Sequence, residues 1–363
     1  MPDRDIVIPE VPGVLAAGAV RATIEAIADW QLPSGMIPWF PGGHADPWNH
    51  VEAAMALDLG GLRTEAERAY QWLVDMQRPD GSWHQYYLAD GIEQDKLDAN
   101  TIAYLAAGVW HHWLVTDDRG FVEDLWPTVE AAVEFVLDLQ APGGEIIWAR
   151  HADGTPWSFA LLTGSSSMVH SLRCAVAIAE LLGHERPDWE LSVDRLADVV
   201  RRHCLGDAPD AFAPKHRWAM DWYYPVMCGV LRDGEAKSRL DERRDTFIMD
   251  GLGVRCVSDR PWVTAAETSE CLLAHLSVGE RDLAIDLFTW AQVLRCDDGH
   301  YFTGVVSPEM VNFPGGERTT YTDAAIVLAA DAISGTSPAS ALFVDHDALP
   351  VLARVDGDDP VTD

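Results

Sequence analysis

The chain has 363 residues, of which 48% are hydrophobic and 23% charged, so it can bury a large apolar core. Its formal net charge of −32 argues against nucleic acid as a partner and against binding to anionic membrane surfaces, because both are negatively charged. Charged residues interrupt every apolar run before the roughly 20 residues that span a bilayer, which predicts no membrane insertion. The first residues do not resemble a signal peptide and the six cysteines are scattered, so we expect a cytoplasmic protein.

Helices with one charged and one apolar face recur along the chain. In the second of them, Ala66, Ala69, Tyr70 and Leu73 return at three- and four-residue steps opposite a charged face. The predicted amphipathic helices span about 15–31, 62–78, 119–139, 189–204, 236–248 and 281–296.

Several of these helices end in a glycine turn that is followed by an aromatic residue. Proline and glycine stop a helix and turn the chain sharply. The turns have the sequences ADWQLPSGMIPW (28–39), VDMQRPDGSW (74–83), LDLQAPGGEIIW (137–148) and VLRCDDGHYF (293–302), with a fainter copy in IMDGLGVRC (248–256).

After each turn and a variable loop comes a second helix that is apolar nearly all round, as expected for a helix buried on both sides. The predicted apolar helices span 46–59, 95–114, 165–182, 218–231, 262–276 and 321–333. Alternating amphipathic and apolar helices predict an all-α protein, an (α/α)6 toroid of six helical hairpins with an outer and an inner ring. Residues 1–340 would form this single domain and residues 341–363 an acidic C-terminal tail, and no segment has the pattern of a strand.

Polar and aromatic residues gather at the first turns of the apolar helices. Because all inner helices of a toroid run in the same direction, these first turns should line one funnel. Flat aromatic rings together with carboxylates favour a carbohydrate, although an acid at a helix start often caps the helix and a large ring can simply fill the centre. The predicted substrate-binding residues are Trp48, His50, Glu52, His151, Trp218, Asp221, Trp222, Trp262, Tyr321 and Asp323.

Two carboxylates are the predicted catalytic pair. The second inner helix faces the fifth across a six-membered ring, which places Asp98 opposite Glu267. Glycoside hydrolysis needs two carboxyl groups that flank the bond, one of them with a raised pKa. Glu52 and Asp221 form a reserve pair that would hold sugar hydroxyls.

The sequence resembles the six-hairpin glycosidases, most nearly the bacterial glucoamylase family. The resemblance rests on residues 98–138 and on NFPGGERTTYTDAAIVLAADAI (312–333). It implies a glycoside hydrolase with an (α/α)6 fold. The family's acid directly follows a tryptophan, but here Trp148 precedes Ala149, and Thr303 stands near the place of the family's base. The resemblance therefore implies that carboxylates elsewhere in the funnel act.

Three alternatives remain open. The segment MQRPDGSW (76–83) resembles the Q-x-x-D-G-x-W repeat of terpene cyclases and prenyltransferase β-subunits, which are also toroids, but their acidic motifs are not found. A sugar epimerase would use histidines, for which His50, His151 and His170 are candidates. A non-catalytic carbohydrate-binding toroid is the third. We predict a glycoside hydrolase that acts on an intracellular saccharide or glycoside, a small molecule or an oligosaccharide, with neither metal nor cofactor.

Overall fold

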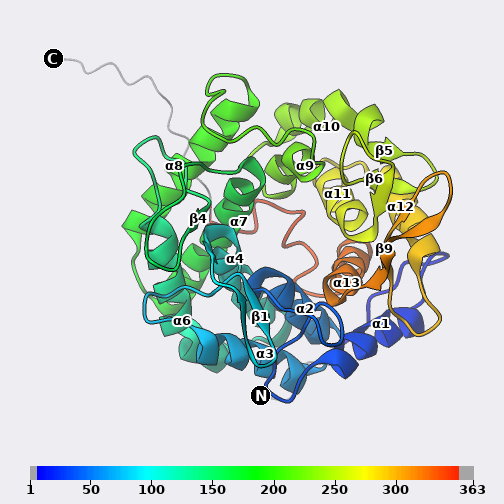
Figure 1. Ribbon diagram of the computed structural model, residues 1–363, viewed down its shortest axis with the longest axis horizontal. Coiled ribbons are helices and arrows are strands. Elements are labelled where there is room, and N and C mark those ends of the chain that lie inside the picture. The colour runs from blue at the N-terminus through cyan, green and yellow to red at the C-terminus, as the bar shows by residue number, and fades with distance from the viewer. Residues whose placement is uncertain (1–5, 351–363) are drawn as a thin grey trace.

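The computed structural model describes residues 6–350, which form two concentric rings of helices (Figure 1). The outer ring consists of α1 (Ala17–Trp30), α3 (Arg63–Met76), α6 (Arg119–Leu137), α8 (Pro187–Cys204), α10 (Asp233–Phe247) and α12 (Arg281–Ala291). The inner ring consists of α2 (Pro47–Leu59), α4 (Ala99–Ala103) with α5 (Leu105–Thr116), α7 (Leu162–Leu182), α9 (Met220–Met227), α11 (Ala265–Ser277) and α13 (Thr320–Ser334). The predicted (α/α)6 toroid is confirmed.

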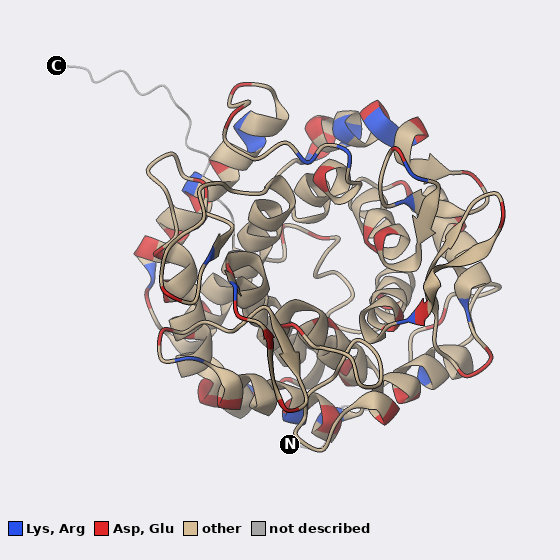
Figure 2. Ribbon diagram, viewed as in Figure 1, with Lys and Arg blue, Asp and Glu red and all other residues tan. Residues whose placement is uncertain are grey.

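The two rings differ in how their helices are buried. Outer helix α3 buries one stripe, which includes Ala66, Ala69, Tyr70 and Leu73, whereas α2 buries every residue from His50 to its end at Leu59. Charged residues accordingly lie mostly along the outer helices in Figure 2, with few on the inner ring. Within residues 6–350, no helix is both long and apolar enough to cross a membrane.

The loops between outer and inner helices contain short strands, which the sequence pattern did not predict. One five-stranded antiparallel sheet has the order β5-β6-β7-β8-β9. Its strands are β5 (Ile248–Met249), β6 (Gly253–Arg255), β7 (Trp262–Thr264), β8 (Phe302–Val306) and β9 (Val311–Arg318). Because β7 leads directly into α11, the fifth inner helix begins three residues later than predicted.

Two smaller sheets and a short 3-10 helix complete the secondary structure of the described residues. Strand β1 (Tyr86–Leu88) pairs with β2 (Gly91–Gln94), and β3 (Leu97–Asp98) pairs with β4 (Ala149–Arg150). The 3-10 helix η1 spans Gln292–Leu294, directly after α12. The β3–β4 pairing places Asp98 opposite Ala149 and so joins the loops that precede two neighbouring inner helices.

A glutamine at the end of an outer helix ties that helix to the next outer helix. The side-chain nitrogen of Gln77 donates to the carbonyl of Gly81 at 3.0 Å and to the carbonyl of Thr128 in α6 at 2.9 Å. Gln31 and Gln140 make the corresponding pairs of bonds. The recurring Q-x-x-x-G spacing thus fixes the distance between successive outer helices.

The glycine of each such turn lies against the backbone of the next outer helix. Gly81 has a φ of +86°, and a Cβ there would overlap the carbonyl oxygen of Ala131. Only glycine tolerates both that φ and that approach. The same close approach to a carbonyl oxygen recurs at Gly35, Gly144 and Gly299, of which Gly299 meets Ala22 and closes the ring onto α1.

Part of the predicted C-terminal tail belongs to the domain. The guanidinium of Arg173 donates to the carbonyls of His346, Leu349 and Pro350, and the ring of Phe343 stacks on His170 at 4.7 Å. Residues 341–350 therefore pack against the ring, behind its central opening in Figure 1, which corrects the predicted boundary at 340. Residues 351–363 of the predicted tail lie outside the described residues.

We expect Gly81→Ala to lower the free energy of unfolding by more than about 3 kcal/mol, because it adds a steric clash to an unfavourable φ. Gly154→Ala is the matched control: its φ is +91°, but nothing lies within 4 Å of the added Cβ. We expect it to cost about 1–2 kcal/mol. Urea denaturation followed by circular dichroism measures both, and equal losses would show that the close approach contributes nothing.

Candidate active site

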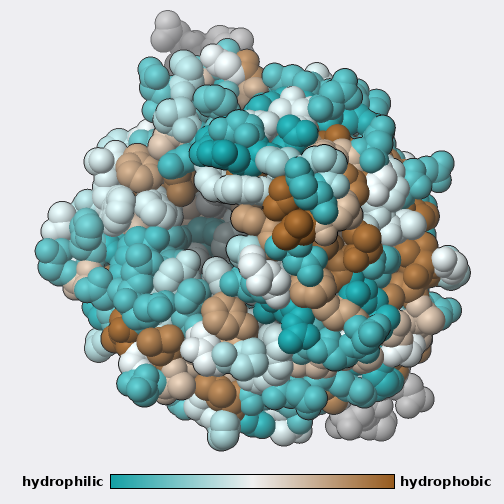
Figure 3. All heavy atoms as spheres, turned by 45° about the vertical axis from the view of Figure 1, so that its right-hand side comes forward, coloured by the Kyte–Doolittle hydropathy of each residue, from teal (hydrophilic) through white to brown (hydrophobic). Residues whose placement is uncertain are grey.

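The first turns of the six inner helices face the same side of the ring, where the connecting loops and short strands also lie (Figure 1). Figure 3 shows the entrance as a hollow, with mainly polar residues on one side and a group of apolar residues on the other. Carboxyl groups of the inner helices occur at two levels. The upper level lies at the helix starts, and the lower level lies about one turn further along the helices.

Asp98, at the upper level, is both the end of β3 and the N-cap of α4. Its Oδ1 accepts from the backbone nitrogen of Asn100 at 3.1 Å, and its Oδ2 lies 3.4 Å from Nζ of Lys96. The Lys96 ammonium lies 3.9 Å from the centre of the Trp148 ring. Burial raises the pKa of Asp98, and Lys96 is the strongest influence in the opposite direction.

Glu267 lies in the first turn of α11, and its side chain is partly exposed. Burial raises its pKa, and the neighbours that oppose this effect, the Thr264 hydroxyl and the helix backbone, are uncharged. Asp98 thus has a cation beside it, whereas the groups that stabilise the charged form of Glu267 are uncharged.

Glu52 and Glu270 form the lower level. Oε1 of Glu52 accepts from Nε1 of Trp48 at 2.8 Å and from the hydroxyl of Tyr104 at 3.1 Å. Oε1 of Glu270 accepts from the hydroxyl of Tyr224 at 2.7 Å, and its Oε2 accepts from Tyr223. Both carboxyl groups line a cavity of about 20 Å³, which has room for about one water molecule.

These two carboxyl groups resist ionisation. Burial raises the pKa of Glu52 to about 7 and raises the pKa of Glu270 well above its usual range. The negative charge of Glu52 raises the pKa of Glu270 further, since like charges disfavour each other in a buried site. Hydrogen bonds from tyrosine and tryptophan lower the two pKa values again, but less than burial raises them. The pair therefore holds at least one proton at neutral pH.

Asp46 has the capping function that is common at helix starts. Its two oxygens accept from the backbone nitrogens of Trp48 and Asn49, from the Asn49 amide and from Nε1 of Trp39, at 2.7–3.1 Å. Four donors saturate the lone pairs of a carboxylate. Asp46 thus fixes the start of α2 and the orientation of Trp39.

Six of the predicted site residues lie in the first two turns of inner helices or in the short strands that lead into them. Trp48 and Glu52 are joined by their hydrogen bond, and the ring of Tyr321 meets Trp39 edge-on at 4.9 Å. Trp262 stacks on Phe313 at 4.5 Å where the five-stranded sheet borders the entrance. Asp98 and Glu267 are the remaining two.

Three predicted substrate-binding residues point toward the outer ring instead, which corrects their assignment. The ring of Trp222 is fully buried, stacks on Phe247 and donates to the carbonyl of Arg239 in α10 at 2.7 Å. The carboxylate of Asp323 accepts from the nitrogen of Tyr301 at 2.8 Å and from His300 at 2.6 Å.

His50 is the third of these residues. Its Nδ1 accepts from the nitrogen of Ile37 at 3.1 Å and its Nε2 bonds the Ala69 carbonyl at 2.9 Å, while burial lowers its pKa to about 4. The first turn of an inner helix has one side that faces the outer ring and another that faces the funnel. The position of a residue in the first turn therefore does not show on which side its side chain lies.

The remaining predicted residues lie beside the funnel. His151 is exposed and stacks on Trp157 at 5.1 Å, and Trp218 is 42% exposed on the loop before α9. Asp221 accepts from the Thr163 hydroxyl at 2.6 Å and lines a separate recess between α7 and α9. His170, an epimerase candidate, is buried against Phe343.

Glu270 and the tyrosines that donate to it were not among the predicted site residues. Glu270 follows Glu267 by three residues and therefore lies on the same face of α11. That spacing was the available signal. Lys96 was also missed, because only the β3–β4 pairing brings Trp148 close to it.

Comparison with known proteins shows the family to which the chain belongs. No protein-family model matches the chain. The chain is 49% identical to MMP endo-(1,4)-3-O-methyl-alpha-D-mannosidase from Mycolicibacterium hassiacum. The aligned region of 336 residues covers 93% of this chain and 92% of that enzyme. A solved glycosidase in complex with glucose superposes with a TM-score of 0.69 at 14% identity, over 88% of this chain and 96% of the other.

Two further structures share the fold at low identity. The GH63 mannosylglycerate hydrolase from Thermus thermophilus has a TM-score of 0.67 at 14% identity, over 86% of this chain and 99% of the other. A D-mannose isomerase has a TM-score of 0.69 at 10% identity, over 90% of this chain and 100% of the other. At such identities these likenesses show the fold alone.

The chain is a glycoside hydrolase with an (α/α)6 fold, and its substrate is a saccharide. It belongs to the family of the Mycolicibacterium hassiacum endo-mannosidase. The comparisons support the glycosidase class and do not single out the glucoamylase family.

We expect Glu52→Gln to stabilise the protein more at pH 8 than at pH 5. The pKa of Glu52 is raised in the folded state, so folding stability is lost as pH rises from the unfolded pKa toward about 7. Glutamine removes this loss and keeps an oxygen for the Trp48 and Tyr104 donors. We expect the difference between the two pH values to be on the order of 2 kcal/mol.

Urea denaturation at both pH values measures this effect, with Glu25→Gln on the exposed face of α1 as the control. If Glu52→Gln changed stability equally at the two pH values, the raised pKa of Glu52 would be wrong.

Proposed function

We propose that this enzyme cleaves internal 1,4-bonds in chains of 3-O-methyl-α-D-mannose. The observation that supports this substrate is the 49% identity with the Mycolicibacterium hassiacum enzyme along 93% of the chain. The funnel is chemically suited to methylated sugars, because the rings of Trp48, Tyr321 and Trp262 offer apolar surface for methyl groups and sugar C–H faces.

In the proposed mechanism, Glu267 is the general acid and Asp98 the general base. Glu267 would donate its proton to the glycosidic oxygen as the bond breaks, since burial favours its protonated form. Asp98, whose negative charge Lys96 stabilises, would take a proton from the attacking water. Because the two residues start opposite inner helices, we propose that a sugar and a water bind between them and that the configuration at the anomeric carbon is inverted.

We propose a cytoplasmic location for the enzyme. The six cysteines of the described residues are free thiols, and four of them are buried. Free thiols are typical of reducing compartments. The saccharide would then be an intracellular one.

The substrate can be tested by digesting 1,4-linked 3-O-methyl-α-D-mannose oligosaccharides, with unmethylated 1,4-α-mannose and 1,4-α-glucose chains in parallel. We expect mass spectrometry to show internal fragments from the methylated chains and at least about tenfold slower cleavage of the other two, since a methyl contact is worth about one to three kcal/mol. Release of single end sugars only, or a preference for glucans, would overturn the proposal.

The catalytic pair can be tested with Asp98→Asn and Glu267→Gln. Each variant should fold and lose at least about 100-fold in turnover, as removal of a general acid or base does. Asp75→Asn and Glu25→Gln, on exposed faces of outer helices, are the matched controls that should stay active. If Asp98→Asn remains active while Asp46→Asn folds and loses turnover, the base has been assigned to the wrong carboxylate.

A further inference from the structure

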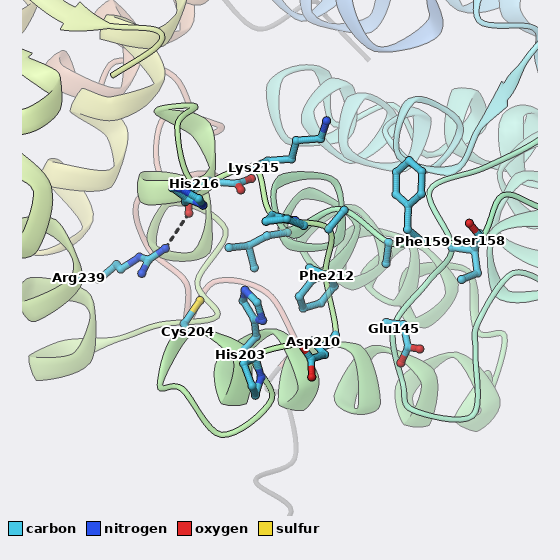
Figure 4. A pocket seen from close by; sticks show the side chains of 18 of the residues that line it. Glu145, Ser158, Phe159, His203, Cys204, Asp210, Phe212, Lys215, His216 and Arg239 are labelled. Carbon is cyan, nitrogen blue, oxygen red and sulfur yellow. Dashed lines mark hydrogen bonds between the residues drawn. The ribbon is translucent and has the colours of Figure 1, made fainter. Parts of the chain in front are cut away.

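A recess of about 630 Å³ lies beside the funnel, between inner helices α7 and α9 and the ends of outer helices α8 and α10. This volume falls within the range of about 300–1,000 Å³ that is usual for small-molecule sites. Figure 4 shows Ser158 and Phe159 on one side of it, Arg239 and Cys204 on the other, and Phe212 between them. The residues of the loop 209–216 form another part of the wall.

The charges in the recess indicate a neutral ligand. The charged side chains that line it are Glu145, Asp210 and Asp221, against Lys215, Arg239 and Arg243. Arg239 donates to the carbonyl of Asp221 at 2.9 Å, and Arg243 donates to the carbonyl of His216. These two guanidinium groups therefore hold the wall together. Balanced charge, hydrogen-bonding groups and two phenylalanine rings fit an uncharged polyhydroxyl compound.

Aromatic contacts connect the recess with the proposed base. Phe159 stacks on Trp148, with ring centres 5.4 Å apart and an angle of 26° between the planes. The ammonium of Lys96, which lies beside Asp98, is 3.9 Å from the centre of the Trp148 ring. Asp221, which accepts from the Thr163 hydroxyl, lines the recess at the first turn of α9. Trp148 thus contacts both Phe159 of the recess and Lys96 beside Asp98.

We propose that this recess binds sugar units of the substrate chain that extend beyond the bond being cleaved. This inference rests on the proposed endo-acting function. Phe159 and Phe212 contact the apolar faces and methyl groups of these units, while Asp221, Ser158 and Lys215 bind their oxygen atoms. The recess thus makes the enzyme favour internal bonds of long chains over bonds near a chain end.

The test measures kcat/KM of the wild-type enzyme and of each variant on two substrates. One is a long methylated chain, and the other is a short oligosaccharide that spans only the funnel. We expect Phe159→Ala to lower kcat/KM on the long chain at least about tenfold and on the short one less than about twofold. Ser158→Trp, which adds a ring to an exposed wall position, should have the same selective effect by filling the recess. We expect Lys215→Ala to lower kcat/KM on the long chain selectively as well. Lys237→Ala, on the exposed face of α10, is its matched control.

The outcomes separate this inference from the proposed function. If wild type cleaves methylated mannosides but the variants lose activity equally on long and short substrates, the recess does not bind the chain. In that case Phe159 only supports Trp148. If wild type does not cleave these chains at all, the proposed function fails and with it the ligand assigned to the recess.

Discussion

The ring depends on the contact between a glycine turn at the end of one outer helix and the backbone of the next. At Gly81 the turn lies so close to Ala131 that a side chain has no space. The amide of Gln77 then bonds both the turn and Thr128, so the contact has a fixed geometry as well as a short distance. Repeating this contact around the molecule sets the spacing of the outer helices, and that spacing determines where each inner helix can begin.

The same turns gather polar groups at one end of the ring. Each turn leads through a loop into an inner helix, whose first backbone N–H groups need acceptors. Asp46 and Asp98 supply them, so carboxylates that the helices require gather at this end of the ring. Glu52 and Glu270 are different, because they lie too deep to cap a helix and are held by tyrosine and tryptophan donors at an electrostatic cost. Buried groups of this kind are typical of functional sites.

Helical periodicity and the repeated turns were enough to predict the two rings, since both signals are local in sequence. Which residues face the funnel was only partly predictable. Trp48 and Trp222 both lie in the first turns of inner helices, yet one bonds Glu52 in the funnel and the other bonds Arg239 in the outer layer. Such a difference depends on where each helix begins and how it is rotated, which loops and long-range strand pairing decide. The β3–β4 pairing that brings Trp148 to Lys96 is of this long-range kind.

The chemistry of the entrance also limits the kind of saccharide that the enzyme accepts. Carboxyl groups on α2, α4 and α11 surround the funnel, and Lys96 is already engaged with Asp98. An anionic sugar would meet like charge there, whereas a neutral sugar gains hydrogen bonds from its hydroxyls. Replacing one hydroxyl by a methoxy group removes a donor and adds apolar surface, a change that favours aromatic neighbours over further carboxylates. The rings of Trp148 and Phe159, which stack on each other beside Lys96, offer such a surface. These features are the basis on which we propose a long, neutral and methylated chain as the substrate.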